Sequence, residues 1–203
     1  MSYVAKEIDV QETVNDFIKF CDYVKAEKPN ATTKGDLSTK GCFSINHILR
    51  NPRKDAKPTD RMYQYPAVSL WFSVAKESGI ITTEDAKGGK VVFTTTDNYK
   101  MFKNMNVFSQ YMLIIQTWYC FVDIATQYME RGSNYLLSNV IDNTFDVLGK
   151  NGTSKWYQND DSKGIGYFSG HEPITYLLEH GYKTACILVD LGLIVVEESG
   201  HIS

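Results

Sequence analysis

Apolar residues near the start of the chain recur every three or four positions, which is the pattern of a helix with one buried face. They are Val10, Val14, Phe17, Ile18, Cys21 and Val24. Asp9 and Glu12 have the spacing of a capping pair at a helix N-terminus. Pro29 ends the pattern, because proline cannot donate the next hydrogen bond of a helix. The pattern therefore predicts a first helix between Asp9 and Pro29.

Two further helices are predicted before residue 80. A polar, glycine-containing stretch over residues 28–37 is typical of a loop, and a short helix is expected after it, ending before Pro52. Its apolar residues are Phe43, Ile45, Ile48 and Leu49. Pro66 suits the first turn of the next helix, and Gly79 stands where a left-handed cap would end it. The buried face of that helix is expected to consist of Val68, Trp71, Phe72 and Ala75.

A hairpin is predicted directly after Gly79. Two β-branched runs, residues 80–83 and 91–95, flank a Gly-Gly turn. Thr96 can cap a short helix that continues to Lys103. Two helices followed at once by a hairpin are in the order of a winged helix.

The longest apolar stretch, YMLIIQTWYCFVDIA over residues 111–125, is too short to cross a bilayer, which needs about 20 residues. We expect it to form a helix that is buried on nearly all sides. Further helices are expected over residues 135–148 and from residues 174 and 185, followed by a strand over 191–196. The fragments AKESGIITTE and LVDLGLIVVEE share a helix end, a glycine and an apolar run, which predicts half of a second winged helix.

Together these patterns predict a mainly α (α+β) fold. A winged-helix-like unit with a small β-hairpin would occupy residues 1–105, and a helical region packed on it would occupy residues 106–203. One continuous domain is the alternative.

Several short segments, in this order along the chain, also resemble a known family. They are TTKGDL (32–37), INHIL (45–49), Pro52, Tyr65-Pro66, VAKESGII (74–81), VVFTTTDNYKMF (91–102) and YMLIIQTW (111–118). Their order and spacing are similar to the N-terminal region of the uncharacterised bacterial proteins named after the third open reading frame of a root-inducing plasmid. Many members continue into a separate α/β domain, which the helical pattern after residue 120 does not match. The resemblance implies a winged-helix-like module and carries over no catalytic residue.

Composition and charge narrow the functions that such a fold would serve. The 203 residues carry 21 Lys+Arg and 24 Asp+Glu for a formal charge of −3, and 43% are hydrophobic. These values exclude a disordered chain and a uniformly basic nucleic-acid coat. The charge is uneven, because nine positive and four acidic residues give +5 over residues 25–61, whereas five positive and eleven acidic residues give −6 over residues 121–203.

The basic segment favours non-specific contact with nucleic acid through phosphates. The candidate residues lie in the loop over 50–61, on the helix after Pro66 and at the hairpin turn. They are Arg53, Lys54, Lys57, Arg61, Lys76, Lys87 and Lys90. The outer face of the helix would offer only Ser69, Ser73 and Lys76, which is poor for base recognition because bidentate contacts need Arg, Asn or Gln. The alternative hypothesis is a non-catalytic module for protein association or homo-oligomerisation.

No sequence motif for catalysis, a metal or a cofactor is found. Cys42 and His47 lack an orienting acid, and His171 and His180 are expected at solvated helix ends rather than at a metal. The cysteines form no C-x-x-C pair and are predicted to be buried, reduced thiols. They are Cys21, Cys42, Cys120 and Cys186. The N-terminus lacks the basic start of a secretory signal, so we expect a cytoplasmic, non-enzymatic protein, with a site assembled only by folding as the open alternative.

Overall fold

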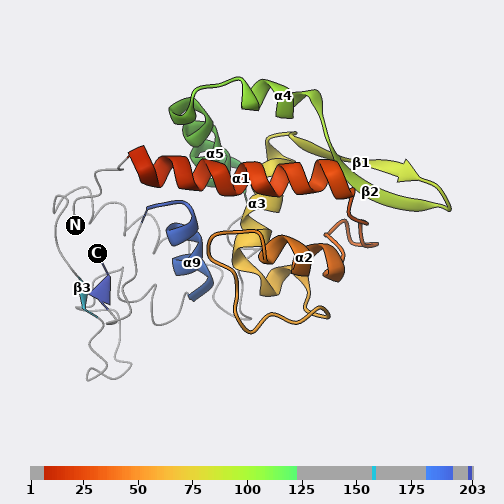
Figure 1. The fold of residues 1–203 in the computed structure, drawn as a ribbon, viewed down its shortest axis with the longest axis horizontal. Helices are drawn as coiled ribbons and strands as arrows, with labels where there is room; N and C mark the ends of the chain where they lie inside the picture. The colour runs from red at the N-terminus through yellow and green to blue at the C-terminus, as the bar shows by residue number, and fades with distance from the viewer. Residues whose placement is uncertain (1–6, 123–156, 159–181, 194–200, 203) are drawn as a thin grey trace. The chain divides into compact units, whose positions relative to one another are not determined.

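The computed structural model describes residues 7–122, 157–158, 182–193 and 201–202, and Figure 1 labels its helices and strands. The chain divides into two compact units, Glu7–Val122 and a second unit formed by Met1–Lys6 with Asp123–Ser203. The mixture of helices with a small antiparallel hairpin confirms the α+β class. No helix in the described part of the chain is long and apolar enough to span a membrane.

Within the described residues, the first unit contains five α-helices, a single 3-10 turn and two strands. In chain order they are α1 (Glu7–Glu27), α2 (Thr39–Asn46), η1 (Met62–Gln64), α3 (Pro66–Glu77), β1 (Ile81–Ala86), β2 (Lys90–Thr95), α4 (Asp97–Lys103) and α5 (Val107–Phe121). In Figure 1, α2 lies on one side of α1 and α4 on the other, and the hairpin extends past the C-terminal end of α1.

The predicted buried face of α1 is confirmed at five of its six positions, because Ile18 alone is only half-buried. Thr13, Asp16 and Phe20 are buried as well, so the buried face is wider than the apolar stripe. Asp9 lies inside the helix, which corrects its prediction as an N-terminal cap. The helix ends at Glu27, as the proline two residues later requires.

The hairpin forms as predicted, and a third segment joins it. Strand β1 pairs antiparallel with β2, and Gly88 and Gly89 in the turn between them have φ of 81° and 72°. Residues 29–31 then lie along the free edge of β2, where Ala31 N donates to Val91 O at 2.8 Å and Phe93 N donates to Pro29 O at 2.9 Å. Part of the predicted loop over 28–37 therefore belongs to the sheet.

Helix α3 begins with Pro66 and is followed by Gly79 at φ 66°, as predicted, but it has no outer face. All nine residues from Ala67 to Ala75 are buried, and the helix packs against α1, α2, η1, β1 and α5. Ser69 is 3% exposed and Ser73 is 2% exposed. The prediction of an exposed face at these serines is therefore wrong. Neighbouring elements cover the side of α3 that a DNA-recognition helix would have to expose to the groove.

Helix α5 was predicted to be buried on nearly all sides, and this is wrong. It buries one face against α1 and α3 and exposes the other. Its buried residues are Gln110, Tyr111, Ile114, Thr117 and Trp118. Because α5 packs on α1 and α3, the first unit continues to Val122, past the expected boundary between residues 105 and 106.

The second unit is described by β3 (Tyr157–Gln158), α9 (Tyr182–Asp190) and β4 (His201–Ile202), with β3 antiparallel to β4. The helix predicted from residue 185 corresponds to α9. Residues 191–193 form a turn rather than the start of the predicted strand, because Gly192 adopts φ 70°. The helices predicted over residues 135–148 and from residue 174 lie outside the described residues.

The two helix ends of the predicted half-repeat close in the same way, whereas most of its second apolar run lies outside the described residues. At the end of α3, the amides of Ser78, Gly79 and Ile80 donate to carbonyls four, three and five residues earlier. The amides of Leu191, Gly192 and Leu193 make the same three bonds at the end of α9. Both ends place glycine in the left-handed conformation, the common way of closing a helix.

Candidate functional site

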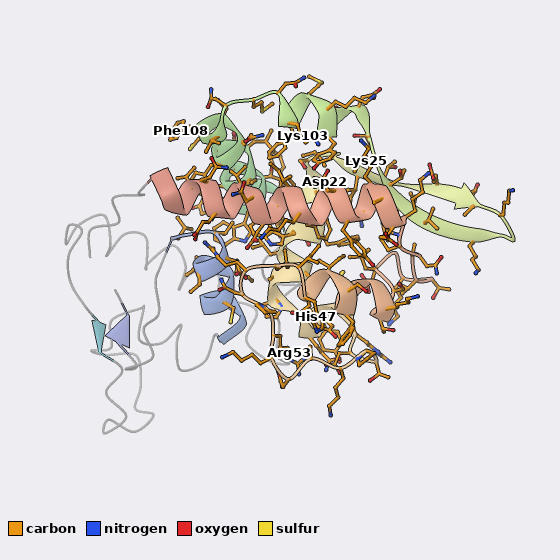
Figure 2. The ribbon with its side chains drawn as sticks, viewed as in Figure 1. Asp22, Lys25, His47, Arg53, Lys103 and Phe108 are labelled. Atoms are coloured by element: carbon orange, nitrogen blue, oxygen red, sulfur yellow. The ribbon has the colours of Figure 1, made fainter. Side chains whose placement is uncertain are left out.

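The basic loop between α2 and α3 is folded around Arg53, which Figure 2 labels. Its backbone N donates to Asn46 Oδ1 at 2.9 Å, and Asn46 Nδ2 donates back to Arg53 O at 3.2 Å. The guanidinium donates to Asp60 Oδ2 and to Gln64 O, each at 3.1 Å. It also holds both carboxylate oxygens of Asp55, at 2.8 and 3.0 Å. Arg53 therefore organises the loop from within.

Because its guanidinium is already bound within the loop, Arg53 is not available for the predicted phosphate contact. Hydrogen bonds to Asp55 raise the pKa of Arg53 above its usual value, and the same bonds lower the pKa of Asp55. Asp60 also accepts from the Lys57 backbone N at 3.0 Å, and Tyr65 Oη donates to Lys57 O at 2.6 Å. A phosphate would have to displace an existing bidentate carboxylate, which is a strong partner for arginine.

Three other candidates of the loop remain exposed. Lys54, Lys57 and Arg61 project from it, and none forms a side-chain ion pair with another residue of the described ranges. Lys76, at the end of α3, lies with its Nζ 6.0 Å from the Phe72 ring centroid. These residues stay available for contact with an anion.

The hairpin does not extend this basic group. Lys87 and Lys90 are exposed at its turn, and β1 carries Glu84 and Asp85 just before them, with Glu84 paired to Lys28. Figure 2 shows Arg53 at the lower edge of the first unit, whereas the tip of the hairpin extends away from it to the right. The loop and the hairpin turn therefore do not form one continuous track for a nucleic-acid backbone.

Cys42 and His47 do not form a nucleophile and base. Cys42 is buried, its thiol donates to Leu37 O at 3.7 Å, and burial raises its pKa to about 12. His47 Nδ1 lies 2.7 Å from Phe43 O, one turn earlier on α2. A thiol that stays protonated at neutral pH is a poor nucleophile. Cys42 and His47 are therefore interpreted as residues that support the fold.

A polar cluster of Tyr99, Asp22 and Lys103 joins α1 to α4 and also supports the fold rather than catalysis. Tyr99 Oη donates to Asp22 Oδ1 at 2.8 Å and to Ile18 O at 3.3 Å. Lys103 Nζ lies 3.6 Å from Asp22 Oδ1 and 5.1 Å from the Tyr99 ring centroid. Burial, and then the bond to Asp22, raise the pKa of Tyr99 far above its usual value. The phenol stays protonated at neutral pH and holds two helices together.

The two remaining cysteines of the sequence prediction differ in exposure. All four thiols are free, and Cys21 is buried like Cys42. Cys120 is exposed and Cys186 is partly exposed. The prediction of buried thiols is therefore wrong for Cys120, because this residue lies on the open side of α5. Among the described residues, no group of three His, Cys, Asp or Glu side chains is placed to hold a metal ion.

The most distinctive surface of the first unit was missed by the sequence analysis. Four large apolar side chains are exposed in a row along α4 and the start of α5, and we call this row the apolar face. Met101 is 63% exposed, Met105 36%, Phe108 67% and Met112 45%. Met101 lies on α4 and Met105 in the turn before α5, whereas Phe108 and Met112 are four residues apart on α5 and so lie on one side of it. Figure 2 shows Phe108 at the outer edge of α5.

A signal for this face was present in the sequence. No charged residue occurs between Asn104 and Val122, so α5 has no Asp, Glu, Lys or Arg on either side. The outer face of a helix that meets only water is usually charged or strongly polar. The apolar run predicts burial on nearly all sides, whereas α5 exposes an uncharged, apolar face.

Comparison of the chain with protein-family models, with curated proteins and with solved structures gave no match.

Proposed function

We propose that residues 7–122 form a winged-helix-like module that acts by association with another protein chain. The order α1, strand segment 29–31, α2, α3 and hairpin supports the winged-helix comparison, as does the pairing of that segment with β2 rather than β1. The long connection over residues 47–65 between α2 and α3 departs from a short helix-turn-helix.

The apolar face is the observation that carries this proposal. Exposed apolar patches on monomeric proteins are small, and larger ones mark binding surfaces. Methionine and aromatic residues are enriched where proteins meet, since they provide area and adapt to a partner. Three of the six methionines of the chain lie on this one row. The partner expected here presents an uncharged, apolar surface.

The burial of α3 argues against base reading in the major groove. A recognition helix inserts an exposed face into the groove and brings several side chains to base edges. Ser69 and Ser73 are covered, which leaves Lys76 alone at the end of the helix. Association with protein therefore accounts for more of the observed surface than sequence recognition does.

Affinity capture from an extract of the source cells tests the proposal. Tagged wild-type chain, Phe108→Glu and the control Ile48→Glu would be compared, since Ile48 is also exposed, at 39%, but lies away from the apolar face. We expect an identified chain, at fixed stoichiometry, to be held by wild type and Ile48→Glu and lost from Phe108→Glu. The same captured set for all three variants would contradict the proposal.

A second candidate function is non-specific phosphate binding by the basic loop, favoured by the exposed positions of Lys54, Lys57 and Arg61. Three phosphate contacts would lower log K with log salt by a slope of about 3. Fluorescence anisotropy with duplex DNA between roughly 50 and 200 mM salt, over which such contacts weaken, measures that slope. Changing all three residues to Gln should abolish it, whereas Arg53→Lys should not. A flat response of the wild type would exclude this candidate.

A further inference from the structure

We infer that the partner seated on the apolar face is a second copy of this chain, paired about a two-fold axis beside Phe108. This inference rests on the proposed function and names its partner. It follows from the charge, the spacing and the area of the face.

The lack of charge makes the face complementary to itself. In a two-fold interface each patch meets its own copy, so a charged residue near the axis faces an identical charge. Met105, Phe108 and Met112 carry no charge, and no charged residue occurs between Asn104 and Val122. A partner of opposite charge would find nothing to recognise here, whereas a second copy meets no electrostatic repulsion near the axis.

The spacing of the face also suits a copy that runs in the opposite direction. Phe108 is the most exposed of the four side chains, and it lies near the middle of the row. On α5 itself, Phe108, Met112 and Ile115 follow spacings of four and three, so the α5 helix of a second copy can lie antiparallel along this side with its Phe108 near the axis. Alternating spacings of three and four are those at which two helices pack side by side. Antiparallel helices also place their dipoles favourably.

The area of the face sets the strength of the association. With roughly 200 Å² for a large side chain, the exposed parts of the four residues amount to on the order of 400 Å². A standard stable interface uses about 800 Å² from each partner. Helix α5 adds Ile115, which is partly exposed, and the polar rim around the face adds further area. The expected product is a reversible dimer whose population depends on protein concentration.

Light scattering after size-exclusion chromatography of the purified full chain tests the inference. The 23.1 kDa chain should approach twice its mass at high concentration and return toward the monomer on dilution. Phe108→Glu should stay monomeric at every concentration, and Ile48→Glu should behave as the wild type. Circular dichroism of each variant checks that it is folded, and Met112→Lys provides a second variant should Phe108→Glu fail to fold.

Disulfide trapping tests the position of the axis. In a Cys120→Ser background, Phe108→Cys should give a covalent dimer on mild oxidation, whereas Ile48→Cys should not.

A wild type that is monomeric at all concentrations, or a dimer that survives Phe108→Glu and Met112→Lys, would overturn the inference. If the purified chain is monomeric but Phe108→Glu still releases a captured protein, only the second copy is refuted. If Phe108→Glu leaves capture unchanged, the proposed function fails as well.

Discussion

At the residue scale, Arg53 shows why a basic side chain in a loop is an ambiguous signal. Its sequence context, with prolines and several lysines nearby, favoured a phosphate contact. Two acids of the same loop, Asp55 and Asp60, instead take up its guanidinium. The acids were present in the sequence, but which of the neighbouring cations they would bind depended on the path of the loop.

The loop gives a first prediction at Asn46. This side chain is 2% exposed and makes two hydrogen bonds to the Arg53 backbone. Asn46→Ala should lower the free energy of unfolding by about 1–3 kcal/mol, because it leaves buried polar groups without partners. Urea denaturation measures the change. Lys54→Ala is the matched control in the same loop and should stay within about 0.5 kcal/mol.

Thiol exposure gives a second prediction. Iodoacetamide should modify Cys120 first, since its side chain is exposed, and Cys186 more slowly. Cys21 and Cys42 should resist at pH 8, because burial raises the pKa of both thiols and restricts access. Peptide mass spectrometry at timed intervals gives the order. Rapid labelling of Cys42 in the folded protein would contradict the packing described for α2.

At the scale of elements, sequence patterns located the helices whose ends are set by residues close by in the chain. Pro66 at the start of α3, Gly79 after it and Thr96 before α4 each act within a few residues, so their roles could be predicted. The strand formed by residues 29–31 could not, because its partner on β2 lies about sixty residues later and the pairing uses backbone atoms. The complete burial of α3 escaped prediction for a similar reason, since surfaces from five other elements cover it.

Glycine substitutions test the end of α3. Gly79 has φ 66°, and a Cβ added there would lie 3.2 Å from Asn98 Nδ2. Gly35 has φ 79° with nothing within 4 Å of an added Cβ. Alanine should cost about 1–2 kcal/mol at either position because of the left-handed backbone. Gly79→Ala should cost more than Gly35→Ala in thermal or urea unfolding, and equal costs would mean that the contact with Asn98 yields without strain.

At the scale of the whole molecule, the formal charge of −3 does not show which charges are paired with one another in the fold. Of the nine cations over residues 25–61, Lys28 pairs with Glu84, Arg50 with Glu12 and Asp16, and Arg53 with Asp55 and Asp60. Several of these pairs join residues far apart in the chain. The basic segment was correctly located from the sequence, but its free charge could be judged only after folding had assigned the partners.

The contact between α1 and α4 gives a prediction for the pH dependence of stability. The raised pKa of Tyr99 means that its phenol stays protonated in the folded chain while the unfolded chain ionises near pH 10. The stability that this group contributes is therefore complete below pH 10 and is lost as pH rises further. Cys42 acts in the same direction between pH 9 and about 12.

Tyr99→Phe separates the phenol from the thiols. The substitution should cost about 1–2 kcal/mol at pH 7, through the lost bond to Asp22, and should weaken the fall in stability above pH 10. Urea unfolding at intervals from pH 7 to pH 11 measures both effects. An unchanged alkaline slope would assign the pH dependence to other groups.

The segment over residues 29–31 has a consequence for how copies of this chain can meet. It occupies one edge of β2, and Ala31 pairs in turn with Leu37, so no long ladder is left open on that side. The opposite edge is β1, which carries Glu84 and Asp85. Charged and occupied edges discourage strand-by-strand growth into fibrils. The first unit can therefore present an apolar helix to solvent while its hairpin sheet, within the described residues, offers no template for aggregation.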